Sequence, residues 1–279
     1  MNTSAPFLCL LTAALLSGCL DHAVRDGRNA LGQGRYEDAI RFFDDAVTRL
    51  PTPKRPLSDL ASAHRALAGV LIQRGDCAGA SEHIRRADAL STPLLIDHQG
   101  LFRCLETAKA PPEVRQKVME RLVALGESRG PILRELVVAF LDQRRHDDAM
   151  KYAPAARARF ALQTEDYRRL GFVFATAGRH DQAVSYLHQF MRSTPTDPLA
   201  RLKLATSLEA LGKHVSARQM YTSLTSDFPK NPVIYLRLAA YCTRQRDTYC
   251  ADDARRTANE LRGIQRQNRS LRPLLKSKR

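Results

Sequence analysis

The sequence has no tryptophan, and aromatic residues make up only 6% of it. It also contains no G-x-S-x-G, H-E-x-x-H or P-loop pattern, the signatures of serine hydrolases, zinc proteases and nucleotide-binding proteins. Most aromatic residues stand at regularly spaced apolar positions rather than among basic ones, which argues against RNA recognition. We therefore expect no catalytic residues, no cofactor, no metal site and no nucleic-acid partner. An enzyme whose site escapes these patterns is the remaining alternative.

Acidic residues are scarce relative to basic ones. The chain of 279 residues has 44 Lys and Arg against 29 Asp and Glu, a net charge of +15. Such a charge favours an anionic partner, for example phospholipid head groups or an acidic envelope polymer. The last segment, residues 263–279, has basic residues and no acidic ones, and we predict that it is a disordered basic tail.

No apolar run is long enough to cross a bilayer, which needs roughly 20 residues. The N-terminus instead has a short apolar run, Phe7 to Leu16, followed by Ser, Gly and Cys19. The stretch 16–19 resembles the bacterial lipobox, in which the cysteine becomes the lipidated first residue of the mature protein. The resemblance implies a signal peptide over residues 1–18, a palmitate-bearing lipid on Cys19 and, because Leu20 follows, sorting to the outer membrane. The alternative is a buried N-terminal helix in a cytosolic protein.

A period of 34 residues dominates the rest of the chain, and His146, His180 and His214 stand on it. Within one period, apolar residues at positions 4, 7, 8 and 11 predict one face of a first helix. Glycine at 15 suits a turn, alanine at 20 lets a second helix approach, and proline at 32 ends that helix. In the period starting at 164 these positions hold Tyr167, Leu170, Gly171, Phe174, Gly178, Ala183 and Pro195, and the apolar Leu187 stands at position 24.

This pattern resembles the tetratricopeptide repeat, a helical hairpin of 34 residues. The resemblance implies an all-α fold in which hairpins stack into a right-handed superhelix, or α-solenoid. The predicted segments are repeats over 19–51 and 61–93 with a proline-rich linker at 52–60 between them, a divergent hairpin over 94–129, repeats over 130–163, 164–197, 198–231 and 232–262, and the basic tail.

In this register the three histidines open second helices. Equivalent residues of stacked repeats lie about one helix-packing distance apart, roughly 8–10 Å. A zinc ion needs its nitrogen ligands at about 2.0–2.1 Å. The three histidines are therefore not expected to converge on one metal ion.

Besides the lipidated Cys19, four cysteines remain after the predicted signal peptide, an even number that suits an oxidising compartment. Cys242 and Cys250 occupy positions 11 and 19, which face each other across a hairpin turn, and we predict a disulfide between them. Cys77 and Cys104 are the second candidate pair. The alternative for all four is unpaired thiols.

The family resemblance also implies a partner-binding groove. Positions 2, 5, 9 and 12 of the first helices line the concave face, and core packing does not need them. In the last three repeats many of these residues are apolar, which is typical of a binding surface. The alternative is that neighbouring helices or the tail cover this face. The predicted groove residues are Arg168, Phe172, Leu199, Leu202, Thr206, Val233, Leu236 and Ala240.

Repeats and anchor together resemble the pilotin lipoproteins of type IV pilus assembly, and also accessory lipoproteins of barrel assembly and polysaccharide export. The resemblance implies a scaffold on the periplasmic side of the outer membrane, anchored by lipid, that binds protein partners, among them a pilus secretin. A module that binds anionic envelope polymer, such as peptidoglycan or lipopolysaccharide, is the competing hypothesis.

Overall fold

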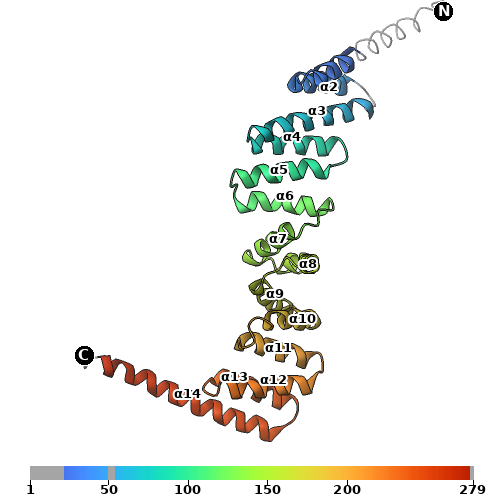
Figure 1. The fold of residues 1–279 in the computed structure, drawn as a ribbon. Helices are drawn as coiled ribbons and strands as arrows, with labels where there is room; N and C mark the ends of the chain where they lie inside the picture. The colour runs from blue at the N-terminus through green and yellow to red at the C-terminus, as the bar shows by residue number, and fades with distance from the viewer. Residues whose placement is uncertain (1–21, 50–53, 277–279) are drawn as a thin grey trace, which may run out of the picture. The chain divides into compact units, whose positions relative to one another are not determined.

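The computed structural model describes residues 22–49 and 54–276, and these residues form helices joined by short turns, with no strand among them. The predicted signal peptide and Cys19 lie outside the described residues. A helix over residues 22–32 comes first. The later helices (Figure 1) are α2 (Tyr36–Arg49), α3 (Lys54–Gln73), α4 (Cys77–Leu90), α5 (Leu95–Thr107), α6 (Pro112–Ala124), α7 (Gly130–Asp142), α8 (His146–Ala158), α9 (Thr164–Thr176), α10 (His180–Met191), α11 (Pro198–Ala210), α12 (His214–Asp227), α13 (Pro232–Arg244) and α14 (Thr248–Lys276).

The chain divides after Ala139 into two compact units, which we call unit 1 (residues 1–139) and unit 2 (residues 140–279). In unit 1, α3 packs against α2, α4 and α5, and α5 packs against α6. In unit 2, α9 pairs with α10, α11 with α12, and α13 with α14, while α9 also lies against α11. This is the hairpin stacking expected of an all-α repeat fold.

The first helices of the last two hairpins, α11 and α13, each begin with a proline that follows an N-cap side chain. Pro198 and Pro232 are the first residues of α11 and α13, where a missing N–H costs nothing. The side chain of Asp197 accepts a hydrogen bond from the Ala200 amide at 2.8 Å, and that of Asn231 accepts one from the Val233 amide at 3.1 Å. These N-caps fix where each first helix of the last two hairpins begins.

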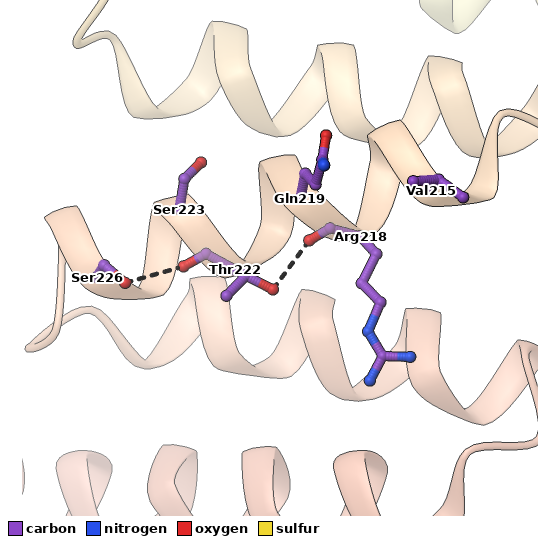
Figure 2. Close-up of a pocket in the computed structure, with 6 residues that line it drawn as sticks. All are labelled: Val215, Arg218, Gln219, Thr222, Ser223 and Ser226. Atoms are coloured by element: carbon purple, nitrogen blue, oxygen red, sulfur yellow. Dashed lines mark hydrogen bonds between the residues drawn. The ribbon is translucent and has the colours of Figure 1, made fainter.

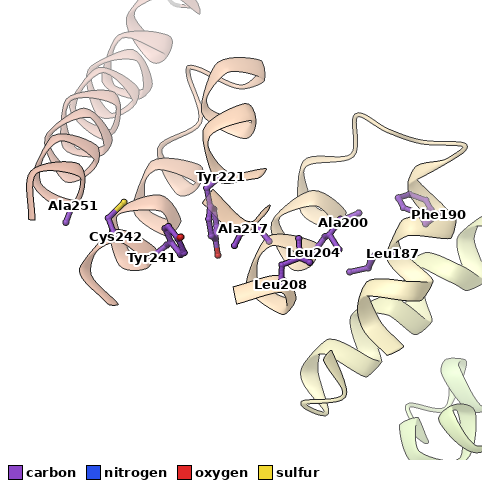
Figure 3. Packing of buried hydrophobic residues seen from close by; sticks show 11 residues of the cluster. Leu187, Phe190, Ala200, Leu204, Leu208, Ala217, Tyr221, Tyr241, Cys242 and Ala251 are labelled. Carbon is purple, nitrogen blue, oxygen red and sulfur yellow. The ribbon is translucent and has the colours of Figure 1, made fainter. Parts of the chain in front are cut away.

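A continuous apolar core extends from α10 to α14 of unit 2 (Figure 3), with Leu187, Leu204 and Tyr221 fully buried along it. Gly171 in α9 faces Leu187 of α10, and a Cβ atom at residue 171 would lie 2.7 Å from the Leu187 side chain. Only glycine therefore permits the observed approach of α9 to α10.

Two predicted boundaries differ from the structure. Helix α3 begins at Lys54, inside the predicted linker 52–60, because Pro56 lies in the first turn, where proline is compatible with a helix. Helix α14 continues to Lys276 through the segment predicted to be a disordered basic tail, 263–279. Arginine, glutamine and leucine, which are common in that segment, are good helix formers.

Among the described residues, none of the helices has both the length and the apolar character that crossing a membrane requires.

Candidate functional site

The first helices of unit 2 carry a row of incompletely buried apolar side chains, which we call the first-helix stripe: Phe172 of α9, Leu199 and Leu202 of α11, and Val233 and Leu236 of α13. Leu199 is 55% exposed and Val233 is 50% exposed. Phe172 and Leu202 are half-buried and pack against the apolar core of unit 2. The stripe is thus anchored in the core and keeps apolar surface open to solvent.

Arg168 lies at the α9 end of the stripe, and its guanidinium is already paired with carboxylates of unit 2. Its Nε donates to Asp197 at 3.1 Å, and its Nη1 donates to Glu165 at 3.2 Å. The guanidinium carbon also lies 4.9 Å from the centre of the Phe172 ring, within the range of a cation–π contact. Arg168 therefore ties α9 to the start of α11 and fixes the Phe172 ring.

Polar groups farther along the stripe are also paired within the protein. Thr206 donates its hydroxyl to the carbonyl of Lys203 at 2.9 Å, within its own helix. Arg244 forms two hydrogen bonds with Glu209, at 2.6 and 2.8 Å, and this pairing raises the pKa of Arg244. Ala240 adds a small half-buried side chain. Since these charges and hydroxyls are satisfied, the stripe offers a partner mainly apolar contact.

The buried hydroxyl of Tyr221 lies near this charged pair. Burial, first, and the negative charge of Glu209, after it, raise the pKa of Tyr221 well above its usual value. The tyrosine therefore stays protonated and serves as a packing residue.

Sequence reasoning missed a second surface, a shallow hollow of about 530 Å³ on α12 (Figure 2). The hydroxyls of Thr222 and Ser226 donate to carbonyls one turn earlier in the helix. Val215 is 75% exposed at the start of α12, where α10 instead has Asp181. An apolar residue in the first turn of a second helix is the signal that could have indicated this surface. Its lining residues are Val215, Arg218, Gln219, Thr222, Ser223 and Ser226.

The structure joins the cysteines in two disulfides. Cys77 of α4 is bonded to Cys104 of α5, with their Cα atoms 5.7 Å apart. Cys242 of α13 is bonded to Cys250 of α14, with their Cα atoms 5.8 Å apart. The first links successive hairpins, whereas the second closes the turn of a single hairpin.

One cluster among the described residues contains the kinds of side chain that bind metal ions. Asp247 lies with Cys242 and Cys250 in a group of three possible ligands, but the two sulfur atoms are bonded to each other. The three histidines of the 34-residue period open α8, α10 and α12. In the part of the chain that the structure describes, these histidines do not join such a group.

Two family models match the chain, both described as tetratricopeptide repeat, over residues 25–92 and 174–241. No curated protein sequence matches it.

Solved structures resemble the fold at low identity. MamA of MSR-1 is 15% identical with a TM-score of 0.46, covering 61% of this chain and 98% of that chain. YrrB, described as a TPR protein with an unusual peptide-binding site, is 13% identical with a TM-score of 0.47, covering 64% and 91%. PilF of Pseudomonas aeruginosa is 19% identical with a TM-score of 0.36, covering 70% and 88%. These likenesses concern the fold alone.

Proposed function

Because the chain is a tetratricopeptide repeat protein, a class that typically forms non-enzymatic interaction scaffolds, we propose that unit 2 docks a protein partner on the first-helix stripe. The observation that carries the proposal is the exposure of Leu199 and Val233, which occupy the same position of successive repeats. Their side chains are not needed to fill the core, and contiguous exposed apolar surface is typical of interaction sites.

The chemistry of the stripe defines the kind of partner. Its charged neighbours, Arg168 and Glu209, already have partners within unit 2. A segment that buries apolar side chains between α9, α11 and α13 fits this surface better than a charged terminus does. An extended or helical apolar segment of another protein is therefore the proposed ligand.

The proposed setting is the periplasmic face of the outer membrane, with the chain anchored through lipid on Cys19. There it would act as a scaffold during assembly of an envelope complex. The type IV pilus secretin is the first candidate for that complex and the barrel-assembly machinery the second, both on the strength of the lipobox-like sequence combined with the repeats.

The stripe is tested with the double variant Leu199→Asp/Val233→Asp. Both side chains are half exposed, so the variant should fold, while two new carboxylates oppose apolar docking. We expect capture of envelope partners by crosslinking to fall at least tenfold. The matched control is Ile96→Asp in unit 1, which alters a side chain that is 61% exposed and should leave capture unchanged. If the stripe variant captures the same crosslinked partners in the same amounts as the wild type, the proposal is wrong.

The anchor has its own test, because stripe and anchor are independent. Replacing Cys19 with serine should release the chain from the membrane fraction, whereas continued membrane retention would contradict lipidation.

Binding of anionic envelope polymer is the second candidate function, and the net charge of +15 favours it. Ionic strength separates the two functions, since salt screens exposed charges over about 8 Å at physiological concentration. Polymer binding should weaken steeply between low and high salt, and docking on the apolar stripe should change little.

A further inference from the structure

A pair of histidines in unit 1 takes no part in the surfaces described above. His64 of α3 and His83 of α4 face each other with their Nδ1 atoms 2.9 Å apart. The ring centroids are 5.1 Å apart and the ring planes are tilted by 34°. His64 is only 3% exposed, whereas His83 is half-buried and reaches the surface. Two imidazole nitrogens are therefore held together between α3 and α4, one on a buried residue and one on a half-buried residue.

The surroundings keep both rings neutral. Burial, and after it the neighbouring His83, lowers the pKa of His64 to about 4. Burial, and after it the nearby Arg86, also lowers the pKa of His83. The neutral ring is the form of histidine that binds metal ions.

The nearby charges are compatible with a bound cation. Glu37 of α2, Asp76 before α4 and Glu82 of α4 supply three acidic groups that act on His83. The basic groups are Arg86, which acts on His83, and Arg85, which is bonded to Glu82 at 2.8 Å. Arg86 is itself bonded to Glu82 at 2.8 Å. The local balance of charge is thus negative.

From this geometry we propose that His64 and His83 form a binding site for a divalent transition-metal ion, Cu²⁺ or Ni²⁺. A metal ion about 2.0–2.1 Å from each nitrogen, with the nitrogens 2.9 Å apart, has a ligand–metal–ligand angle of about 90°. A tetrahedral zinc ion would need nitrogens about 3.3–3.4 Å apart at the same bond lengths. Right angles between nitrogen ligands are typical of Cu²⁺ and Ni²⁺ sites.

Binding requires a small rotation of both rings, so that each Nδ1 lone pair points to the ion, and the transfer of one proton. In the neutral pair, one Nδ1–H donates to the other Nδ1. When the ion binds, that proton moves to Nε2 of the same ring through solvent, both Nδ1 lone pairs become ligands, and no net proton is released. Water fills the remaining positions, because within the described residues the pair has no third His, Cys, Asp or Glu ligand grouped with it.

The test is titration of Cu²⁺, Ni²⁺ and Zn²⁺ into the full chain after treatment with EDTA, followed by calorimetry and by electron paramagnetic resonance of the copper form. We expect one site per chain, two coupled nitrogens in the copper spectrum, and Ni²⁺ bound more tightly than Zn²⁺. The variant His83→Gln keeps an amide able to hydrogen-bond with His64 but removes a ligand, and it should bind Cu²⁺ at least tenfold more weakly.

The matched control is His214→Gln, the same substitution at an exposed histidine of unit 2, which should leave binding unchanged. Circular dichroism checks that each variant is folded. Equal Cu²⁺ affinity of His83→Gln and the wild type would overturn the site, as would absence of binding to the wild type. Tighter binding of Zn²⁺ than of Ni²⁺ would overturn the assigned geometry.

Discussion

Unit 1 and unit 2 are built from the same kind of hairpin but are held together by different interactions. Buried and half-buried polar side chains connect helices of unit 1: His98 of α5, 7% exposed, bonds to Asp88 of α4 at 2.9 Å, and the half-buried Arg65 of α3 bonds to Asp97 of α5 at 2.9 Å. A disulfide links two of its hairpins. Unit 2 has a continuous apolar core from α10 to α14 (Figure 3) and, beside it, a buried arginine, Arg201, which bonds to Asp227 at 2.6 Å, and a disulfide within a single hairpin.

This difference has a physical lesson. The strength of a polar contact depends on its geometry and on the protonation of its partners, which changes with pH. A disulfide is lost when a reductant cleaves it. Apolar packing depends on shape and volume. Reduction should therefore destabilise both units, and unit 1 more, because its disulfide closes the longer loop. Acid pH should destabilise unit 1, where a buried histidine is kept neutral.

The largest expected effect is the loss of stability when a disulfide is removed, and it should differ between the two disulfides. The bond between Cys77 and Cys104 spans 27 residues and that between Cys242 and Cys250 spans 8. Loop-closure entropy predicts that replacing both members with alanine costs about 3.6 kcal/mol for the first pair and about 2.6 kcal/mol for the second. Denaturant unfolding of the two double variants measures these costs. An equal or larger cost at the shorter loop would contradict the ordering.

The second largest effect is expected from removing side-chain volume from the apolar core of unit 2. Leu204 of α11 is fully buried in the apolar core, so Leu204→Ala should lower the free energy of unfolding by about 3 kcal/mol. The control Leu199→Ala, on the same helix but 55% exposed, should cost roughly 0.5 kcal/mol or less. Hydrogen exchange should show the loss of protection in unit 2, and a loss confined to unit 1 would refute the assignment.

The smallest effect is pH-dependent and belongs to unit 1. His64 has a folded pKa of about 4 against a usual value of 6.5. As the pH falls below 6.5, His64 binds a proton in the unfolded chain but stays neutral in the folded chain. The free energy of unfolding therefore decreases toward acid pH. The expected loss between pH 7 and pH 5 is about 2 kcal/mol.

Hydrogen exchange of α3 and α4, measured with EDTA present so that no metal ion competes, tests this expectation. His64→Phe removes one titrating ring and should reduce the pH dependence, and the remainder is expected from His83, whose pKa burial also lowers. The amides of unit 2, whose histidines are exposed or half-buried, provide an internal control. If α3 and α4 keep the same protection at both pH values, the expectation is wrong.

The sequence predicted the all-α repeat fold because the 34-residue period repeats the same packing requirements. Helices α7, α9, α11 and α13 begin at Gly130, Thr164, Pro198 and Pro232, where proline or a change in periodicity is visible in the sequence. The continuation of α14 was missed because its composition alone does not distinguish a charged helix from a disordered tail.

Surface features were harder to predict. The exposure of Val215 depends on how neighbouring second helices pack around α12, which the period does not specify. The contact between His64 and His83 was missed because their spacing of 19 residues matches no ligand motif, and only the crossing of α3 and α4 brings them together. The proposed groove residues follow from helix register, and whether a partner binds them is a matter for the crosslinking experiment.

The turns within the hairpins show how far a repeat can diverge. Gly178 and Gly212 have φ angles of 74° and 71°, and Arg144 and Arg246 have φ angles of 58° and 60°. Each of these residues is the fifteenth from the first residue of its hairpin's first helix. A left-handed backbone is thus kept at this position even where a side chain makes it cost about 1–2 kcal/mol.

Lys109, with φ of 51°, is likewise the fifteenth residue from Leu95, in the hairpin that lacks the consensus. The tight turn between paired helices therefore requires a left-handed residue at this position, whether or not that residue is glycine. The requirement belongs to helix ends in general, because Gly126 and Phe160, which follow α6 and α8, also have positive φ angles.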